Sequence, residues 1–500
     1  GKELALTRVA VIGGGFGGIS AAIVLAKNGL EVDLIDPNEE PGGKISTTLF
    51  NGHSIDSGPT VITLKDVFEN LFEIAGEKLH ENVELVELEI IARHSWGSNE
   101  VLDLYSNIDK SFESINKFAG KEEAIKFRDF CELSKSLYKV LEKNYIKKQR
   151  PSMLQLTNSI GLFGAKLMWK AGLMKSLWGS LEKKFSDPRL QQLFGRYSTY
   201  CGSSPWLSPS TLMLIWNVEM QGVWSVKGGI IELARALTKI AKKNGVRFHK
   251  GFCEEILTYG NNVSGVRLQG GKHILCEKII YNGDHEALDN FFIGKKTVSN
   301  KSFFKPTRSL SAITWVVRSK TRGFNLSRHN VFFDSDYHKE FFDIFKKNTL
   351  PEKPTVYICA QDRENNINIA DEPERLLLLI NAPPNGDDTI FSNTELKRCQ
   401  SSVISLLKRC GLTIETNPKE WICSTPKEFH QRFPGTGGAL YGRATHGWTS
   451  PFLRPSARSK ILGLYLSGGS IHPGPGVPMV TISGQLAAEA LMEDLDLANQ

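Results

Sequence analysis

Three glycines near the start of the chain follow the pattern G-x-G-x-x-G, which is typical of phosphate-binding turns: Gly13, Gly15 and Gly18. They stand between an apolar run over 9–12, predicted to be a strand, and a segment over 19–29, predicted to be a helix. A second predicted strand over 31–36 ends on Asp36. In such a unit the glycine backbone approaches a pyrophosphate at the helix N-terminus, here beside Phe16, and the carboxylate accepts ribose hydroxyls. The sequence therefore predicts a dinucleotide-binding site.

A second open backbone lies close to the other end of the chain, in "SGGSIHPGPGVPMVTISG". This stretch has five glycines and three prolines, and it precedes a predicted helix that opens at Met479 or Val480, behind Pro478. Glycine costs conformational entropy, so the stretch indicates a place where backbone must approach a partner closely. The spread-out N–H groups from Gly469 to Val477 suit an anionic or strongly polar partner.

The turn "PGGK" over 41–44 resembles the second FAD signature of the glutathione-reductase-like flavoproteins related to amine oxidases. The resemblance implies that Gly43 and Lys44 contact FAD, with Lys44 standing where Arg is usual. It also implies that the C-terminal glycine stretch meets the FAD phosphates and that the following helix points its N-terminus at the flavin ring. No Cys or His stands in a motif that ties it to a flavin linkage, so we expect non-covalent FAD.

The middle of the chain, "GVWSVKGGIIELARALTKIAKKNGVRFHKGFCEEI", resembles the segment of these flavoproteins that re-enters the FAD domain. There the residue in the place of Cys253 contacts the adenine through its backbone. The expected fold is α/β, with a glutathione-reductase-like (amine-oxidase-like) Rossmann domain assembled from three chain segments. Those segments are 1–75, 222–300 and 437–500. We expect a helical substrate and membrane-contact region over 76–221 and a substrate-binding domain with a mixed sheet over 301–436.

Four stretches together resemble the bacterial phytoene-desaturase-type carotenoid desaturases, and most of all their hydroxycarotenoid 3,4-desaturase branch. They are "DSGPTVIT" (56–63), "RYSTYCGSSPWLSPSTLMLIWNVEMQGVWSVKGG" (196–229), "SLSAITWVV" (309–317) and "GGALYGRATHGWTSPFLRPSARSKILGLYLSGGSIHPGPGVPM" (437–479). The resemblance implies that Gly58, Pro59 and Thr60 contact FAD. It implies a C3–C4 double bond introduced into an acyclic, 1-hydroxylated carotenoid end, including monocyclic γ-carotene derivatives, by hydride transfer to flavin N5 and proton loss.

Other functions of the same fold stay open at this point. They are a phytoene- or squalene-type desaturase or isomerase, an amine oxidase, and a non-enzymatic escort of prenylated proteins. The polyene chemistry does not require a strong base, because the developing cation is spread over the conjugated chain. Glu219 and His472 are the catalytic candidates, each with a structural role as the alternative. Arg443 and His446 either bind a substrate hydroxyl or pin their own loop.

Charge is concentrated in one part of the chain. The segment from Lys147 to Lys184 contains eight basic residues and a single acidic one, Glu182. Its charge of +7 equals the net charge of the whole chain. The same stretch is rich in large apolar residues, which argues against nucleic acid as a partner and for a membrane surface. We expect peripheral membrane contact through 147–184. One helical face is predicted to enter the lipid: Phe163, Leu167, Ala171, Met174, Trp178 and Leu181. Leu162 and Trp169 are expected to pack on protein.

The remaining expectations concern partners and location. The eight cysteines include no C-x-x-C pair, which favours reduced thiols and argues against a zinc site, so no metal is expected. The expected partners are a carotenoid substrate and an electron acceptor, either a quinone or oxygen. The expected location is cytoplasmic, at the inner face of the cell membrane.

Overall fold

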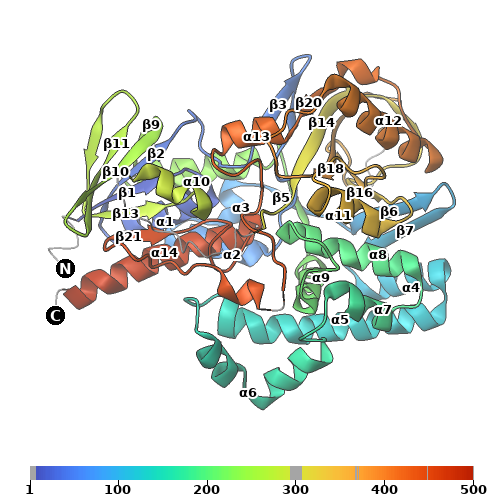
Figure 1. Ribbon diagram of the computed structural model, residues 1–500, viewed down its shortest axis with the longest axis horizontal. Coiled ribbons are helices and arrows are strands. Elements are labelled where there is room, and N and C mark those ends of the chain that lie inside the picture. The colour runs from blue at the N-terminus through green and yellow to red at the C-terminus, as the bar shows by residue number, and fades with distance from the viewer. Residues whose placement is uncertain (1–6, 293–306, 366–368, 370, 448, 499–500) are drawn as a thin grey trace.

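The computed structural model describes residues 7–292, 307–365, 369, 371–447 and 449–498. Two sheets stand next to each other along the long axis, and a layer of helices lies below them in Figure 1. Both ends of the chain lie by the first sheet. Predicted ranges also include 1–6, 293–306 and 499–500, and one motif includes Trp448; these lie outside the described residues.

The first sheet is five-stranded and wholly parallel, in the order β21-β13-β1-β2-β9. Its strands are β1 (Arg8–Ile12), β2 (Glu31–Asp36), β9 (Arg247–Lys250), β13 (Lys278–Tyr281) and β21 (Leu464–Leu466). They come from all three predicted segments of the dinucleotide domain, whose exact boundaries stay predictions. Val11, Leu34 and Ile280 lie in register and are fully buried, as expected for a parallel sheet covered on both faces.

Helices α1 (Phe16–Lys27) and α14 (Val477–Ala498) pack against each other on this sheet. Their axes come close because Gly17 meets Gly484: a Cβ at Gly484 would lie 2.0 Å from the Gly17 carbonyl oxygen. Helix α10 (Ile231–Lys243) also packs on α1. The prediction that α14 opens at Met479 or Val480 is wrong by two or three residues. Pro478 is tolerated in the first turn, where no intrahelical N–H donor is needed.

The second sheet is seven-stranded and mixed, in the order β20-β14-β18-β17-β16-β6-β7. Its strands are β6 (Ile90–Gly97), β7 (Glu100–Tyr105), β14 (Ser311–Ser319), β16 (His329–Phe332), β17 (Val356–Ala360), β18 (Glu374–Ala382) and β20 (Ile422–Ser424). Helix α12 (Asn393–Arg409) buries Val403, Leu406 and Leu407 in the same core. Part of the region predicted as helical over 76–221 belongs to this sheet instead, because the alternating buried Leu102 and Leu104 make β6–β7 a sheet hairpin.

Smaller strands and helices surround the two sheets. Short sheets are formed by β3 (Thr47–Phe50) with β4 (His53–Asp56), β5 (Leu85–Glu87) with β8 (Trp224–Val226), β15 (Thr321–Gly323) with β19 (Leu412–Ile414), and β10 (Cys253–Tyr259) with β11 (Asn262–Leu268) and β12 (His273–Leu275). Further helices are α2 (Lys65–Ile74), α3 (Leu79–Asn82), α11 (Tyr337–Phe345) and α13 (Pro426–Arg432).

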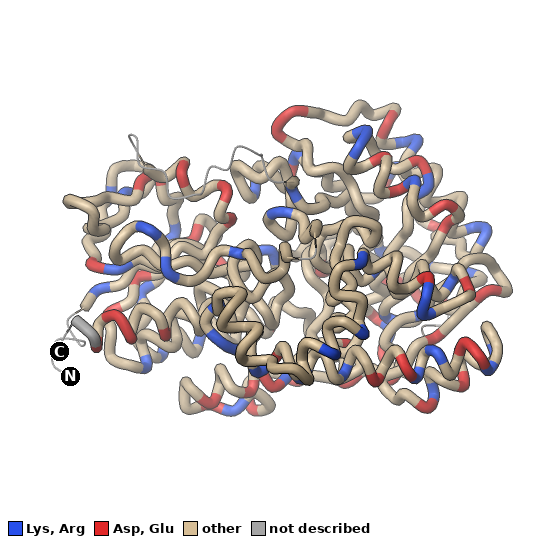
Figure 2. Tube along the Cα trace, turned by 60° about the horizontal axis from the view of Figure 1, so that its bottom comes forward, with Lys and Arg blue, Asp and Glu red and all other residues tan. Residues whose placement is uncertain are grey.

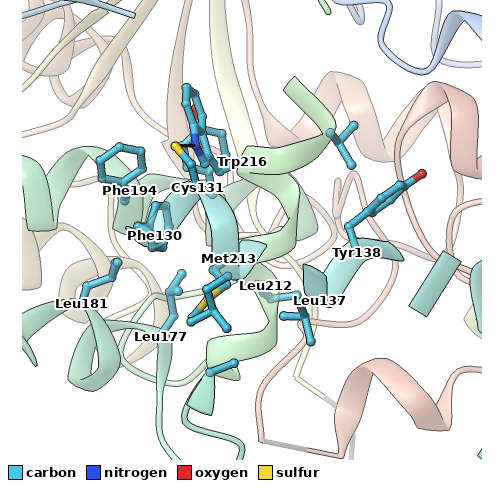
Figure 3. Close-up of a cluster of buried hydrophobic side chains, with 14 of the residues drawn as sticks. Phe130, Cys131, Leu137, Tyr138, Leu177, Leu181, Phe194, Leu212, Met213 and Trp216 are labelled. Carbon is cyan, nitrogen blue, oxygen red and sulfur yellow. Dashed lines mark hydrogen bonds between the residues drawn. The ribbon is translucent and has the colours of Figure 1, made fainter. Parts of the chain in front are cut away.

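The lower helical layer surrounds an aromatic core. It contains α4 (Ile108–Ala119), α5 (Lys121–Leu141), α7 (Leu177–Lys184), α8 (Pro188–Gly195) and α9 (Leu214–Met220). Figure 3 shows Phe130, Phe194 and Trp216 meeting in this core, where the Trp216 indole N–H donates to the Cys131 sulfur at 3.2 Å. Leu177 and Leu181 also point into it.

The helix predicted across 163–181 is interrupted. Helix α6 (Met153–Lys170) is broken at Gly161, whose φ of +64° is non-helical, and a turn separates it from α7. The predicted exposed stripe is therefore wrong in part. Phe163 and Met174 are exposed as predicted, but Leu181 is fully buried, and Leu162 and Trp169, expected to pack on protein, are 84% and 75% exposed. The turn over 171–176 separates α6 from α7 within the stripe, so the two ends of the stripe lie on different helices and face different ways. Among the described residues, no helix combines the length and apolar character needed to cross a bilayer.

Candidate active site

Two glycine turns face each other at the carboxyl ends of β1 and β2. A Cβ at Gly43 would lie 2.8 Å from the Gly15 Cα, and a Cβ at Gly18 would lie 1.9 Å from the Gly13 carbonyl oxygen. Gly15 is the N-cap of α1, and no acidic residue stands in the first turn of that helix. The first turn of α1 therefore brings no negative charge of its own to its backbone N–H groups. We call the turns over 13–18 and 41–44 the glycine cradle.

Asn282 lies at the centre of the glycine cradle, and the sequence reading missed it. Its backbone N–H donates to the Ile12 carbonyl at 2.8 Å, and its Oδ1 accepts from the Ser467 hydroxyl at 2.9 Å. A Cβ added at Gly15 would lie 3.2 Å from the Asn282 Nδ2. This residue ties the turn after β1 to the turn after β21. The only sequence signal is its place directly after the buried strand β13.

Asp36 ends β2 as predicted and is buried. Its Oδ2 accepts the Gly14 N–H at 2.7 Å and its Oδ1 accepts the Asn38 N–H at 2.8 Å. Burial raises the pKa of this carboxyl, while the two N–H donors favour its charged form. The carboxylate therefore stabilises the glycine turn itself, and its contact with a ribose stays a prediction.

Lys44 points away from the first glycine turn. Its Nζ donates to the Leu440 carbonyl and lies 5.6 Å from the centre of the Phe433 ring. Burial lowers the pKa of the ammonium to about 8. Lys44 thus joins the turn over 41–44 to the C-terminal part of the chain, and its predicted contact with a phosphate stays a prediction.

The C-terminal stretch curls back onto the cradle. Gly469 packs on Pro475, and the Gly468 N–H donates to the Ser483 hydroxyl at 3.1 Å. Val477, Pro478 and Met479 form the first turn of α14, so its N-terminus faces this loop. The positive end of the helix dipole is therefore directed at the position predicted for the ring of the cofactor.

His472 is buried in the same loop and holds it in place. Its Nε2 lies 2.7 Å from the Lys148 carbonyl oxygen, so this nitrogen carries the proton, and its ring meets Tyr145 edge-on at 4.5 Å. Burial lowers the pKa of the imidazole to about 4. Because its donor is committed to backbone, the geometry favours the structural role over the catalytic one.

Cys253 begins β10 and packs on the apolar cluster behind β1 and β2. Burial raises the pKa of its thiol to about 12. The side chain is therefore an uncharged space-filler, which is compatible with the predicted backbone contact to an adenine.

The turn Gly58-Pro59-Thr60 lies directly on the glycine cradle. A Cβ at Gly58 would lie 2.1 Å from the Lys44 carbonyl oxygen. From this turn a chain of hydrogen bonds leads into the second sheet: Thr60 Oγ1 lies 2.8 Å from the Tyr357 hydroxyl, which lies 2.7 Å from His329 Nδ1. Burial lowers the pKa of His329 to about 3. Sequence reading offered no signal for Tyr357 or His329, which come from β17 and β16.

Glu219 is buried on α9 among tyrosines. Its Oε1 accepts hydrogen bonds from the hydroxyls of Tyr197 and Tyr200, each at 3.3 Å, and its Oε2 is buried without a partner. Burial raises the pKa of the carboxyl to about 7. The half-buried Arg196 donates to the Tyr200 hydroxyl at 3.4 Å, so hydrogen bonds link an acid, a cation and two phenols in one group.

Three of the four stretches singled out in the sequence meet through hydrogen bonds. The Thr445 N–H donates to the Ser203 hydroxyl at 2.6 Å, and the Ser204 N–H donates to His446 Nε2 at 3.1 Å. The Leu310 N–H donates to the Gly202 carbonyl at 2.9 Å. His446 therefore pins its loop, and burial lowers its pKa to about 4.

Arg443 has a similar position, since its guanidinium donates to the Leu453 carbonyl at 2.9 Å. Of the two interpretations left open for these side chains, the geometry supports loop pinning.

The residues present fit a flavin dinucleotide. The cradle brings backbone N–H groups together where any Cβ would intrude, and a second helix N-terminus arrives from the C-terminal loop. The model of the flavin containing amine oxidoreductase family matches residues 16–492, and the chain belongs to that family.

Within the family the chain is of the carotenoid desaturase type. It is 46% identical over 498 residues to the hydroxyneurosporene desaturase of Rubrivivax gelatinosus, covering 99% of this chain and 95% of that one. It is 38% identical to the hydroxyneurosporene desaturase of Cereibacter sphaeroides, covering 98% of each. Among solved structures, putrescine oxidase bound to putrescine superposes with a TM-score of 0.62 at 12% identity, covering 98% of this chain and 99% of that one. The predicted FAD-binding fold is confirmed, and the chain is a flavin-dependent oxidoreductase.

Proposed function

We propose that the protein binds FAD non-covalently and introduces a C3–C4 double bond into an acyclic, 1-hydroxylated carotenoid end. The observation that carries the proposal is the meeting of the stretches around Gly202, Leu310 and Thr445. These stretches carry the resemblance to 3,4-desaturases. They form one hydrogen-bonded unit, which Leu440 joins to Lys44 of the glycine cradle. The relatives named hydroxyneurosporene desaturase support the same substrate class.

The site suits the removal of hydride from a polyene. Bound flavin would supply the hydride acceptor. The protein's own part would be to hold the chain against the cradle and to exclude water. No strong base is required, because positive charge left on the substrate is spread over the conjugated chain. The absence of a base from the mechanism agrees with the position of His472, because its N–H donates to the Lys148 carbonyl.

The test is a single anaerobic turnover. FAD-loaded protein in liposomes receives a 1-hydroxylated acyclic carotenoid, and the flavin absorption should bleach as the polyene absorption shifts to the red. A quinone or oxygen, the two proposed acceptors, should then restore the flavin spectrum. Reduction of the flavin by an amine, or by phytoene in preference to more conjugated carotenoids, would contradict the proposal.

We also propose that α6 and the turn after it rest on the inner face of the cell membrane. Large apolar side chains are exposed there: Leu154, Leu162, Phe163, Trp169 and Met174. Figure 2 turns this side to the viewer and shows Lys and Arg in the α6 region, and no acidic residue occurs from Pro151 to Leu181. Lysines beside an apolar surface suit anionic headgroups. A carotenoid is too apolar to arrive through water, so the substrate would enter from this side.

Liposome flotation tests the membrane proposal. Replacing Leu162, Phe163 and Trp169 together by Ser should weaken binding by about 4 kcal/mol or more, because each large apolar side chain contributes about 1.5–3 kcal/mol. Reversing Lys166, Lys170 and Lys175 to Glu should cost about 1 kcal/mol per site on anionic vesicles. A matched control replaces exposed apolar residues elsewhere by Ser: Leu49, Phe252 and Leu275. Equal loss in the control would overturn the assignment of this surface.

A further inference from the structure

A group of buried and half-buried polar side chains lies on the far side of the Gly58–Thr60 turn from the glycine cradle. We call it the Arg196 cluster, and its members are Arg196, Tyr197, Tyr200, Glu219 and Tyr357. The Arg196 guanidinium lies 5.6 Å from the centre of the Tyr200 ring and 5.7 Å from that of Tyr357. It therefore lies within cation–π distance of two phenol rings, which is favourable for a cation.

The cluster has hydrogen-bonding capacity left over. Glu219 is 7% exposed, and its Oε2 has no partner even though the two tyrosines both donate to Oε1. Within the described part of the chain, no carboxylate lies within ion-pair distance of Arg196. A buried acceptor without a partner costs free energy, so Glu219 Oε2 indicates a ligand that donates a hydrogen bond. The half-buried Arg196 has N–H donors beyond the one that bonds the Tyr200 hydroxyl, and these can donate to the same ligand. The ligand must both donate and accept a hydrogen bond, which a hydroxyl group does.

The surroundings of the cluster are apolar. Tyr197 packs edge-on to Trp216 at 6.0 Å and stacks with Phe194 at 6.3 Å. Trp216 and Phe194 are both almost wholly buried. A polar ligand group entering this part of the interior would find few other partners, so the cluster is where its polarity would be recognised.

The location of the cluster matches the chemistry of the proposed substrate. Tyr357 donates to or accepts from Thr60 at 2.8 Å, and Thr60 belongs to the turn predicted to contact the flavin. The carbon that bears the hydroxyl is only two bonds from C3, so the hydroxyl must be bound close to the reacting bond. The residues that bind it therefore have to lie beside the Gly58–Thr60 turn, where Arg196 and Tyr357 are found.

We propose that the Arg196 cluster is the subsite that reads the C1 hydroxyl of the carotenoid, with the hydroxyl donating to Glu219 Oε2 and accepting from the Arg196 guanidinium. This rests on the proposed function and names its specificity determinants. Glu219 is then a recognition residue and not the base of the reaction. A site of this kind rejects the analogue without a hydroxyl, because its own polar groups are left unpaired.

The experiment compares two substrates and two variants. The FAD-loaded protein is given an acyclic carotenoid with a C1 hydroxyl and the same carotenoid without it, and the ratio of the two kcat/KM values is measured. Glu219→Gln and Arg196→Met should each lower this ratio about 10- to 100-fold, the range expected for a hydrogen bond to a charged group. The fall should come from the hydroxylated substrate, and flavin content should stay that of the wild type.

A matched control is available in Glu340 of α11. Glu340 is also a buried carboxyl, 1% exposed, but both its oxygens are partnered, by the Thr355 N–H and by Asn381. Glu340→Gln should leave the substrate ratio unchanged. An equal fall in the control, or an equal loss for both substrates in Glu219→Gln, overturns the subsite.

A binding measurement separates this inference from the proposed function. Carotenoids already desaturated at C3–C4, with and without the hydroxyl, are titrated into oxidised protein and followed by the shift of the polyene absorption. The hydroxylated one should bind more tightly in the wild type and lose this advantage in Glu219→Gln. Desaturation of both substrates without any discrimination supports the function and rejects the subsite. Hydroxyl-dependent binding without desaturation rejects the function and supports the subsite.

Discussion

The glycine cradle is made of backbone, whereas the Arg196 cluster is made of side chains. In the cradle, Gly15 and Gly43 approach so closely that a Cβ on either turn would intrude. In the cluster, Glu219 and Tyr357 are brought together from α9 and β17, far apart in the chain. The cradle is proposed to bind the flavin dinucleotide, for which backbone N–H groups suffice. The cluster is proposed to recognise the substrate, which takes side chains of defined polarity.

The largest expected effect tests the cradle. In Gly18→Ala the new Cβ would lie 1.9 Å from the Gly13 carbonyl oxygen, which is backbone and cannot move freely. Overpacking of this kind costs about 3 kcal/mol at the upper end of its usual range. We expect a lowered melting temperature and little bound flavin.

Gly97→Ala is the control for this prediction, because no atom lies within 4 Å of its added Cβ. Gly18→Ala protein with normal stability and flavin content would show that the cradle is not closely packed.

The second prediction tests the cluster through pH. Burial raises the pKa of Glu219 from 4.5 to about 7, so between these values the folded protein holds a proton that the unfolded chain releases. This contribution to stability is therefore lost as pH rises from 4.5 to 7. The Glu219→Gln variant has no carboxyl at this position that could titrate. The difference between its free energy of unfolding and that of the wild type should therefore shift in favour of the variant by up to about 3 kcal/mol as pH rises across that range.

Urea denaturation at a series of pH values measures this difference. The exposed Glu182→Gln serves as the control and should track the wild type. If the difference in free energy of unfolding between Glu219→Gln and the wild type is constant with pH, the Glu219 carboxyl is solvated. The cluster would then not be a buried polar site distinct from the cradle.

The third prediction tests whether the turn at Gly15 binds the pyrophosphate. In Gly15→Ala the added Cβ would lie 3.2 Å from Asn282 Nδ2 and 3.4 Å from Gly43 Cα, contacts that small shifts relieve. The fold should survive, but the methyl would stand where the pyrophosphate approaches. A cost of about 1–3 kcal/mol corresponds to flavin binding about 10- to 100-fold weaker. Titration of flavin into apoprotein measures it, and unchanged affinity would reject this turn as the phosphate site.

The smallest expected effect concerns Asp36. Asp36→Ala removes the acceptor of the Gly14 and Asn38 N–H groups but leaves the phosphate-binding backbone in place. Flavin affinity should fall by about 1 kcal/mol, less than in Gly15→Ala. An effect larger than that of Gly15→Ala would mean that a side chain, and not the backbone, dominates binding in this region.

The sequence alone determined the first part of the molecule well. The predicted strands over 9–12 and 31–36 match β1 and β2, and the predicted helix matches α1 except that it begins at Phe16. Glycine spacing works as a predictor here because the conformation it permits is local. The contacts that the spacing demands, such as Gly18 against Gly13, lie within a few residues of one another.

Only the tertiary structure decided the rest. Asn282 enters the cradle because β13 pairs with β1. Tyr357 reaches Thr60 because the second sheet packs against the Gly58–Thr60 turn. The apolar stripe predicted over 163–181 was wrong in part, since a turn separates α6 from α7 and the aromatic core covers Leu181 of α7. Periodicity specifies that a face is apolar, but not what covers it. That depends on which distant elements pack there, and no local pattern contains this information.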